Sequence, residues 1–400
     1  MNEIRWIRNG MAPSGDAYTS LMGQEEVEKA RAFHRSFPQY RETPLAELPA
    51  MAAYLGIGRL FIKDESWRFG LNAFKALGGS YAMGRYLGEL TGRDPASMDY
   101  RTVTSEALRK ETGEITFFTA TDGNHGRGVA WAARELGQKA VVYMPRGTTG
   151  IRLENILREG ARATIEEASY EECVRMAAEA AAASGGVVVQ DTAWEGYEKI
   201  PSWIMQGYGT MIAEADEQME KAASGPPTHV FIQAGVGSVT GAVAGYFALK
   251  YPQSPPVLIT IEAEAADCLY QSALAGDGKP RRAAGSGETI MAGLNCGEAN
   301  IISWDILRNH CSFFTAISDQ VAVKGMRMAA APLKGDPQVI SGESGAVGLG
   351  LLAALMETEE WKELREAAGL DSASRVLLFS TEGDTDPERY RNIVWRGLER

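Results

Sequence analysis

The sequence predicts an α/β protein whose strands form parallel sheets. Short runs rich in β-branched and aromatic residues alternate with longer runs of helical pattern, and turn residues separate them. Such alternation is typical of βαβ units, in which a helix connects two parallel strands. With 400 residues, 45% of them hydrophobic, the chain can form two or three domains, or one large enzyme fold with an inserted lobe.

The expected elements follow from this alternation, taken along the chain. Pro145 and Gly160 provide the clearest stops, because proline cannot continue a strand ladder and glycine commonly ends a helix. Residues 225–227, Gly-Pro-Pro, and the glycine-rich segment 275–288 are expected to be loops, the second a mobile one. Strands are expected at 59–65, 115–120, 139–144, 163–165, 187–190, 228–233, 256–262 and 375–379, and helices at 126–136, 151–159 and 170–183.

Charge and composition exclude several classes of function. The formal net charge of −12 argues against a nucleic-acid or anionic-membrane partner, because phosphate would be repelled. The first eight residues lack the apolar stretch of a signal peptide, so a cytoplasmic protein is expected. The uncharged run 230–249 contains glycines and polar residues and is interpreted as a strand, a turn and a helix start, not as a membrane span.

The four cysteines lack the spacing of a metal site, and the four histidines do not cluster with them. No metal is therefore expected. Free thiols are the expected state in such a chain. A bridge between Cys268 and Cys296 is the alternative.

The run 72–79, Asn-Ala-Phe-Lys-Ala-Leu-Gly-Gly, is the most informative short segment. It follows the strand expected at 59–65 and places Lys75 between an aromatic residue and a glycine pair. Burial in an apolar pocket lowers the pKa of a lysine and leaves a nucleophilic amine. Such an amine can form a Schiff base with an aldehyde cofactor. The alternative is a surface lysine at the start of a helix.

The run 121–128, Thr-Asp-Gly-Asn-His-Gly-Arg-Gly, joins the strand expected at 115–120 to the following helix. Polar groups in such a turn face the crevice at the carboxyl end of a parallel sheet, where ligands bind. The alternative is a plain loop in which Asp122 or Asn124 only caps the helix.

The run 233–241, Gln-Ala-Gly-Val-Gly-Ser-Val-Thr-Gly, predicts a phosphate-binding loop. Its glycines let the backbone wrap an anion, which backbone amides and the helix N-terminus can hold, helped by the hydroxyls of Ser238 and Thr240. A dinucleotide fingerprint fits less well, because the last glycine comes one position late. Two further segments, 341–346 and 377–384, bring hydroxyls to the ends of elements and have loops as their alternative.

In this order the segments resemble the fold-type II pyridoxal-phosphate enzymes, such as the serine and threonine dehydratases. Those enzymes combine an N-terminal lysine motif, a Gly-Asn loop, a glycine-rich phosphate loop and a C-terminal hydroxyl. The resemblance extends from Thr43 to Asp384. The runs 72–79, 121–128 and 380–386 are moreover similar to those of enzymes that remove ammonia from 2,3-diaminopropionate.

The resemblance implies pyridoxal 5'-phosphate as the cofactor, held by Lys75, with Asn124 bonding its ring hydroxyl. Thr381, or alternatively Ser380, would face the pyridine nitrogen. A neutral hydroxyl there leaves this nitrogen unprotonated and the electron sink mild, which suits β-elimination. The residues expected to hold the phosphate are Gly235, Val236, Gly237, Ser238 and Val239.

The fold implied by the resemblance is the two-lobed, tryptophan synthase β-like architecture. Each lobe is expected to be a mostly parallel sheet covered by helices. Residues 1–86 and 207–400 would form the large, cofactor-binding domain, and residues 87–206 the small one. A homodimer is expected, because symmetric dimers are common and the family resemblance favours one.

The sequence departs from the dehydratase pattern at two positions. Asn72 replaces a serine, and Asp122 stands where a small residue is usual. A carboxylate there can pair with an extra substrate ammonium or act as a base, and Asp191 would add a second acidic group unless it caps a helix before Trp194. Lys75, Asp122 and Asp191 are thus the expected catalytic residues. The expected substrate contacts are Asn72, Thr121, Asp122 and Asp191.

The reaction implied is α,β-elimination of ammonia from 2,3-diaminopropionate, in both its D and L forms, to give pyruvate and two ammonia. Serine or threonine dehydration is the alternative within enzymes. A cofactor-carrying protein without turnover is the alternative outside them. A carboxylate in the substrate crevice favours an enzyme, since cofactor carriage alone does not need one.

Overall fold

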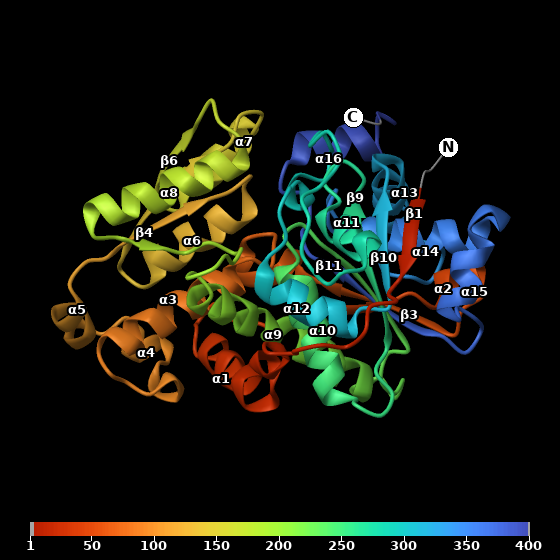
Figure 1. The fold of residues 1–400 in the computed structure, drawn as a ribbon, viewed down its shortest axis with the longest axis horizontal. Coiled ribbons are helices and arrows are strands. Elements are labelled where there is room, and N and C mark those ends of the chain that lie inside the picture. Colours follow the sequence, from red (N-terminus) through yellow and green to blue (C-terminus); the bar gives the residue numbers. More distant parts are fainter. Residues whose placement is uncertain (1–3, 399–400) are drawn as a thin grey trace. The chain divides into compact units, whose positions relative to one another are not determined.

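The computed structural model describes residues 4–398 and divides into two compact units (Figure 1). Unit 1 comprises the described residues up to Ser20, Glu42–Trp67 and those from Met211 onward. Unit 2 comprises Leu21–Arg41 and Arg68–Thr210. Among the described residues, no helix combines the length and the apolar character needed to cross a membrane.

The domain boundaries expected from the sequence, after residues 86 and 206, fall inside two helices. These are α3 (Ala76–Leu90) and α9 (Lys199–Lys221). Unit 2 also takes in α1 (Gln24–Arg35), which precedes the expected small domain in the chain. The expected split into a large and a small domain therefore stays a prediction.

Within the described residues, the sheet of unit 1 has seven strands. The five inner strands are parallel, and the two edge strands run antiparallel to their neighbours. The mostly parallel sheet expected from the sequence is confirmed for this unit. The order across the sheet is β1 (Ile4–Arg8), β10 (Phe313–Ile317), β9 (Val257–Ala263), β8 (His229–Gln233), β11 (Arg375–Ser380), β3 (Arg59–Asp64) and β2 (Leu45–Glu47).

Three of these strands, β1, β10 and β2, were not predicted from the sequence. They are three to five residues long, and both edge strands depend on a partner far away or across a loop. The inner strands are buried almost throughout, which requires helices on both faces of the sheet. These helices are α2 (Pro49–Leu55), α10 (Ser238–Lys250), α11 (Cys268–Ala275), α12 (Ile301–His310), α13 (Asp319–Ala330), α14 (Val347–Glu357), α15 (Lys362–Ala368) and α16 (Pro387–Val394).

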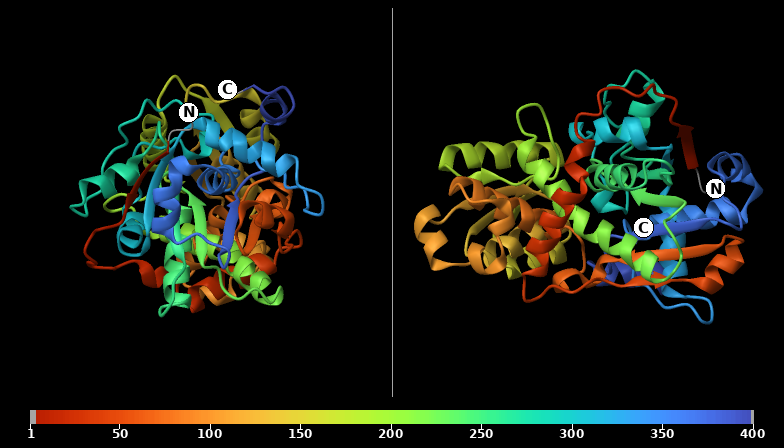
Figure 2. Two further views of the ribbon diagram at one scale, coloured as in Figure 1. Left: turned by 90° about the vertical axis from the view of Figure 1, so that its right-hand side faces the viewer. Right: turned by 90° about the horizontal axis from the view of Figure 1, so that it is seen from below.

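The core of unit 1 is extended by the close packing of α13 against α14, which can be followed in blue in Figures 1 and 2. Gly350 of α14 faces the Val321 carbonyl so closely that a Cβ there would lie 1.9 Å from the oxygen. Gly325 of α13 is in the same position toward Ala346. Glycine is therefore required at both positions, because any side chain would force the two helices apart.

The sheet of unit 2 is fully parallel among the described residues, in the order β6 (Arg162–Ile165), β5 (Lys139–Met144), β4 (Thr116–Ala120), β7 (Val187–Val188). The helices of this unit are α1, α3, α4 (Tyr100–Val103), α5 (Glu106–Thr112), α6 (Asn124–Glu135), α7 (Gly150–Arg158) and α8 (Tyr170–Ser184). The four predicted strands and the three predicted helices, which correspond to α6, α7 and α8, match to within a few residues, and β7 ends two residues early. Helices α1, α3, α4 and α5 were not among the predicted ranges.

Side chains that alternate along β5 contact different helices, which shows that the helices of unit 2 cover both faces of its sheet. Val142 and Met144 pack in a cluster with side chains of α6 and α7. Val141 and Tyr143 point to the other face and pack beside alanines of α8. The sheet thus lies between two helical layers, and the turn from β4 into α6 is fixed on both sides.

Lys63 is a buried lysine that the sequence analysis placed in a strand without assigning it a role. Its amine in β3 is fully enclosed and lies 2.8 Å from Oε2 of Glu214, which is also fully enclosed. The same amine donates to the Thr43 carbonyl at 2.7 Å and to Gln218 Oε1 at 2.9 Å. All three donors of the ammonium are therefore used, and β3 is tied to α9 within unit 1.

Replacing Lys63 by methionine is expected to destabilise the protein by about 3–5 kcal/mol, because it removes the ammonium that pairs with the buried Glu214 carboxylate. Chemical denaturation monitored by circular dichroism measures this loss. The double variant Lys63→Met, Glu214→Leu should recover a large part of the loss, since it removes both charges. A double variant as unstable as the single one would show that the ion pair itself stabilises the fold.

Candidate active site

Lys75 occupies the N-cap position of α3, as the surface-lysine alternative supposed, but its side chain is largely buried. It is 19% exposed, and its amine lies 5.3 Å from the ring centroid of Phe74. Phe74 in turn packs against Tyr208, with ring centroids 4.7 Å apart. The side chain of this lysine is therefore packed against an aromatic residue, but its amine meets a carboxylate and not the purely apolar pocket that was expected.

The loop that leads to Lys75 has an unusual backbone. Phe69, Gly70 and Asn72 all have positive φ angles, which non-glycine residues rarely adopt. The ring of Phe69 stacks on Trp131 of α6 at a centroid distance of 4.6 Å. Local sequence would not hold this loop by itself, so helix α6 contributes to its shape.

Arg127 of α6 fixes the same loop through its backbone. Its Nη1 donates to the Leu71 carbonyl at 3.1 Å, and its Nε lies 3.3 Å from Oε1 of Glu159. Gly128 lets the two backbones meet, because a Cβ there would lie 2.8 Å from the Ala76 nitrogen. The loop that leads to Lys75, here called the lysine loop, is thus held in place against the start of α6.

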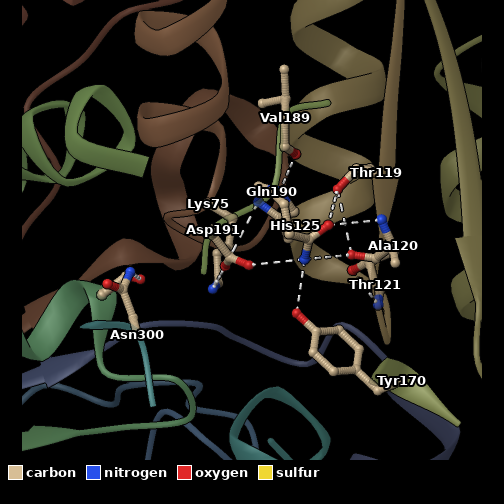
Figure 3. A network of polar contacts seen from close by, with 12 residues as sticks. Lys75, Thr119, Ala120, Thr121, His125, Tyr170, Val189, Gln190, Asp191 and Asn300 are labelled. Atoms are coloured by element: carbon tan, nitrogen blue, oxygen red, sulfur yellow. Dashed lines mark hydrogen bonds and ion pairs between the residues drawn. The ribbon is translucent and has the colours of Figure 1, made fainter. Parts of the chain in front are cut away.

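Asp191 is the ionic partner of Lys75 (Figure 3). It follows β7, is 4% exposed, and binds the Lys75 amine through Oδ2. It caps no helix, since α9 begins only at Lys199, so the interpretation of Asp191 as a cap before Trp194 is wrong. Two groups that are distant in sequence thus form one buried ion pair.

His125 lies beside this ion pair, with Nδ1 3.7 Å from Oδ2 of Asp191. Its Nε2 is 2.9 Å from the Val189 carbonyl, so it donates a proton there and Nδ1 keeps a lone pair. Burial lowers the pKa of His125, so the ring is neutral near pH 7. Burial alone would raise the pKa of Asp191, but the Lys75 ammonium, and His125 whenever it is protonated, lower that pKa. With the imidazole neutral, the Lys75 ammonium is the cation that keeps Asp191 ionised.

Gln190 connects the ion pair to the sheet. Its Oε1 accepts from the Thr119 hydroxyl and the Ala120 nitrogen, both at 2.9 Å. Its Nε2 donates to Tyr170 Oη at 2.8 Å and to the Ala120 carbonyl at 3.1 Å. Figure 3 shows these contacts converging beside Asp191. The end of β7 is therefore held by side-chain bonds where its ladder has stopped.

Asp122 and Asn124 flank the start of α6, but neither is its N-cap residue, which is Gly123. The interpretation of this run as a plain capped loop is therefore wrong for these two side chains. The Asp122 carboxylate, 30% exposed, pairs with Arg152 at 3.2 Å. Thr121 is buried, and its hydroxyl accepts from the Gly123 nitrogen at 2.9 Å, so it shapes the turn.

In unit 1 the predicted phosphate loop forms the turn between β8 and α10. Gly237 is the N-cap residue, with φ +96, so no side chain caps the first amides of α10. A Cβ at Gly235 would lie 3.1 Å from Cys296 Sγ and from the Gly293 carbonyl, which leaves room only for backbone. The Thr240 hydroxyl donates to the Gln233 carbonyl at 2.8 Å, so it stabilises the loop and is not available as a donor to an anion.

The two candidate C-terminal hydroxyls have different partners. Ser380 donates to Ser341 Oγ at 2.7 Å, so its proton is already used. Thr381 accepts a hydrogen bond from Gln233 Nε2 at 2.7 Å and keeps its own proton to donate. The segment 341–346 is tied to the same strand end, since the Ser344 nitrogen donates to Glu382 Oε1. The four cysteines are free thiols, so the alternative of a Cys268–Cys296 bridge is not formed.

Sequence reasoning did not assign roles to His125, Gln190, Tyr170, Arg127 or Arg152. His125 and Arg127 lie inside the run 121–128, and Gln190 directly precedes Asp191, so the motifs could have indicated these three. Tyr170 and Arg152 come from helices whose pattern gives no sign of contact with the site. Only the packing of unit 2 brings them to it.

Comparison with known proteins identifies the family of this chain. The family model for pyridoxal-phosphate dependent enzymes matches residues 37–381. The diaminopropionate ammonia-lyase of Salmonella typhimurium (strain LT2) is 50% identical over 382 residues, which is 95% of each chain. The crystal structure of diaminopropionate ammonia-lyase from Escherichia coli in complex with D-serine has a TM-score of 0.93 at 43% identity and covers 100% of this chain and 98% of that one.

A second crystal structure of the Escherichia coli enzyme, in complex with an aminoacrylate–PLP azomethine reaction intermediate, has a TM-score of 0.91 at 45% identity, with the same coverage. The chain therefore belongs to the pyridoxal-phosphate dependent enzymes and, among them, to the diaminopropionate ammonia-lyases. It is a fold-type II enzyme, as the sequence predicted, and pyridoxal 5'-phosphate is its cofactor.

Replacing Arg127 by methionine is expected to weaken cofactor retention by up to about tenfold. The loop before Lys75 would lose one hydrogen bond, which contributes roughly 0.5–1.5 kcal/mol. Fluorescence titration of the apoprotein with pyridoxal 5'-phosphate measures the change. Arg134→Met is the matched control, because Arg134 also pairs with Glu159 but donates to Glu135 instead of the Leu71 carbonyl. Equal losses in both variants would contradict a role for the Arg127–Leu71 bond.

Proposed function

We propose that this protein eliminates ammonia from 2,3-diaminopropionate with pyridoxal 5'-phosphate and releases pyruvate and a second ammonia. The observation that carries the proposal is the buried pair of Lys75 and Asp191. A bond between the lysine amine and the cofactor aldehyde would remove the ammonium that pairs with Asp191. Loss of one partner from a buried ion pair costs about 3–5 kcal/mol, so the position beside Asp191 would favour a substrate ammonium.

The β-ammonium of 2,3-diaminopropionate supplies that cation, whereas the β-hydroxyl of serine does not. The pKa of Asp191 is held low by the cation beside it, against the effect of burial. A β-ammonium that takes the place of the Lys75 ammonium would keep the carboxylate ionised. Serine or threonine dehydration, the runner-up, leaves the same carboxylate without a cation. A cofactor carrier without turnover would gain nothing from Asp122 and Asp191.

The residues of this chain fit the cofactor. Uncapped amides at the start of α10 and the glycine cradle at Gly235 suit a phosphate, held by residues 235–239. Thr381 has a free proton to donate toward a ring nitrogen, and Asn124 is assigned to the ring hydroxyl. The bound cofactor supplies an electron sink for the negative charge that develops at the substrate α-carbon.

The protein's own groups would move the protons. Lys75 would take the α-proton on its own face. Asp122 is the base assigned to the opposite face, and its partly exposed carboxylate is compatible with reaching a ligand. Asn72, three residues before Lys75, and Thr121, next to Asp122, complete the proposed substrate contacts. The protein is proposed to act as a cytoplasmic homodimer.

Pyruvate release separates the candidate functions. The purified holoenzyme is expected to form pyruvate from 2,3-diaminopropionate at a rate at least about 10²-fold above that from serine, since serine leaves Asp191 without a cation. Borohydride reduction followed by peptide mapping should place the cofactor on Lys75. Comparable rates on both substrates would favour the dehydratase, and no pyruvate from either would favour a carrier.

Asp122→Asn is expected to lower turnover of D-2,3-diaminopropionate by about 10²–10⁴-fold, which is the usual contribution of a general base. Turnover of the L isomer should fall far less, because Lys75 serves that face. Steady-state assays of pyruvate formation with each pure isomer measure the difference. Equal losses on the two isomers would mean that Asp122 serves binding, and the two-base assignment would be abandoned.

A further inference from the structure

Arg152 is a buried cation beside the proposed base of unit 2. It belongs to α7 and is 5% exposed. Its Nη1 lies 3.2 Å from Oδ2 of Asp122 and 3.3 Å from the Asp122 carbonyl. One guanidinium nitrogen therefore contacts both the side chain and the backbone of the same residue.

The aliphatic part of the Arg152 side chain also packs closely against the turn. Its Cδ, Cγ and Cβ pass beneath Gly123, within 3.2–3.6 Å of the place that a Cβ there would occupy. Glycine at 123 thus makes room for the arginine. On the other side of the turn, the Thr121 hydroxyl accepts from the Gly123 nitrogen. The turn 121–123 is held between the two, and the Asp122 side chain remains 30% exposed.

We propose that Arg152 is a positioning residue that sets the isomer preference of the enzyme by fixing the Asp122 carboxylate. The inference rests on the proposed function, in which Asp122 is the base for the D isomer and Lys75 the base for the L isomer. Lys75 has its own partners, Asp191 and Phe74, so Arg152 acts on one of the two bases.

Two opposite effects of Arg152 must be compared. A nearby cation makes a carboxylate a weaker base, but for a partly exposed pair this effect is small, about fivefold or less. A misplacement of about 1 Å in a catalytic group costs about 10²-fold. Positioning therefore outweighs the loss of basicity, and removing Arg152 should slow the D reaction.

The experiment compares kcat and KM for pure D- and L-2,3-diaminopropionate in the wild-type holoenzyme and in Arg152→Met. Methionine keeps much of the buried stem, and removing the guanidinium leaves a carboxylate that water can reach. The kcat for the D isomer is expected to fall by about 10–100-fold, while kcat for the L isomer stays within about threefold. Arg152→Lys retains a cation and should restore part of the D activity.

Arg158→Met is the matched control, because it removes the same charge from the same helix. Arg158 is 66% exposed and pairs with Glu154, away from the turn. Its ratio of D to L turnover should equal that of the wild type. If Arg152→Met does not fold, the ratio in Arg152→Lys decides, since a single flexible ammonium cannot reproduce the fixed guanidinium and should still lower it.

Two results would overturn the role of Arg152. Equal losses of kcat on both isomers would indicate a general structural effect, and a rise in KM for both isomers at unchanged kcat would indicate direct substrate binding. Asp122→Asn, measured in the same series, tests the assignment of Asp122 as a base separately from the role of Arg152. Selectivity in Asp122→Asn without selectivity in Arg152→Met overturns only the role of Arg152. Absence of selectivity in both overturns the base assignment and, with it, the role of Arg152.

Discussion

The buried ion pair between Lys75 and Asp191 is the interaction on which the proposed chemistry of this protein depends. Each charge would be unfavourable in that position by itself, so each one requires the other or a substitute. The lysine is the group that reacts with the cofactor aldehyde in the proposed mechanism. In that mechanism the β-ammonium of a diamino acid replaces the lysine as the cation beside Asp191. The proposed substrate preference thus follows from the electrostatics of one pair.

The neighbours of this pair keep it in place without adding charge. His125 is neutral and bonded to a backbone carbonyl, and Gln190 fastens the end of β7 to β4. The lysine loop, with its positive φ angles, is fixed by contacts to α6 and not by its own sequence. Preorganisation of this kind lets the reacting groups hold their geometry during catalysis.

Buried charges occur elsewhere in the chain, and each is matched in a different way. Lys63 saturates its three donors with Glu214, Gln218 and a backbone carbonyl, which suits a purely structural role. Asp122, by contrast, is matched by Arg152 on one side and remains partly open on the other. A carboxylate that is held but still accessible is suited to proton transfer. The difference between the two pairs is therefore one of access.

The sequence determined the class of this protein. The alternation of strand and helix patterns predicted the parallel sheets. The runs 72–79, 121–128 and 233–241 marked the lysine, the polar turn and the glycine cradle, because each depends on residues that are adjacent in the chain. Short strands such as β2 and β10 were not predicted, because they are strands through their pairing with other strands of the sheet and the local sequence pattern does not indicate them.

Only the tertiary structure decided which of the polar residues act together. It paired Lys75 with Asp191 across 116 positions of the chain and placed Arg152 behind Asp122. It also separated the two C-terminal hydroxyls by giving Ser380 a partner for its proton and leaving that of Thr381 available. The physical reason is that an ion pair or a hydrogen bond is set by distance in space, and a sequence read along its length contains only the distances between neighbours.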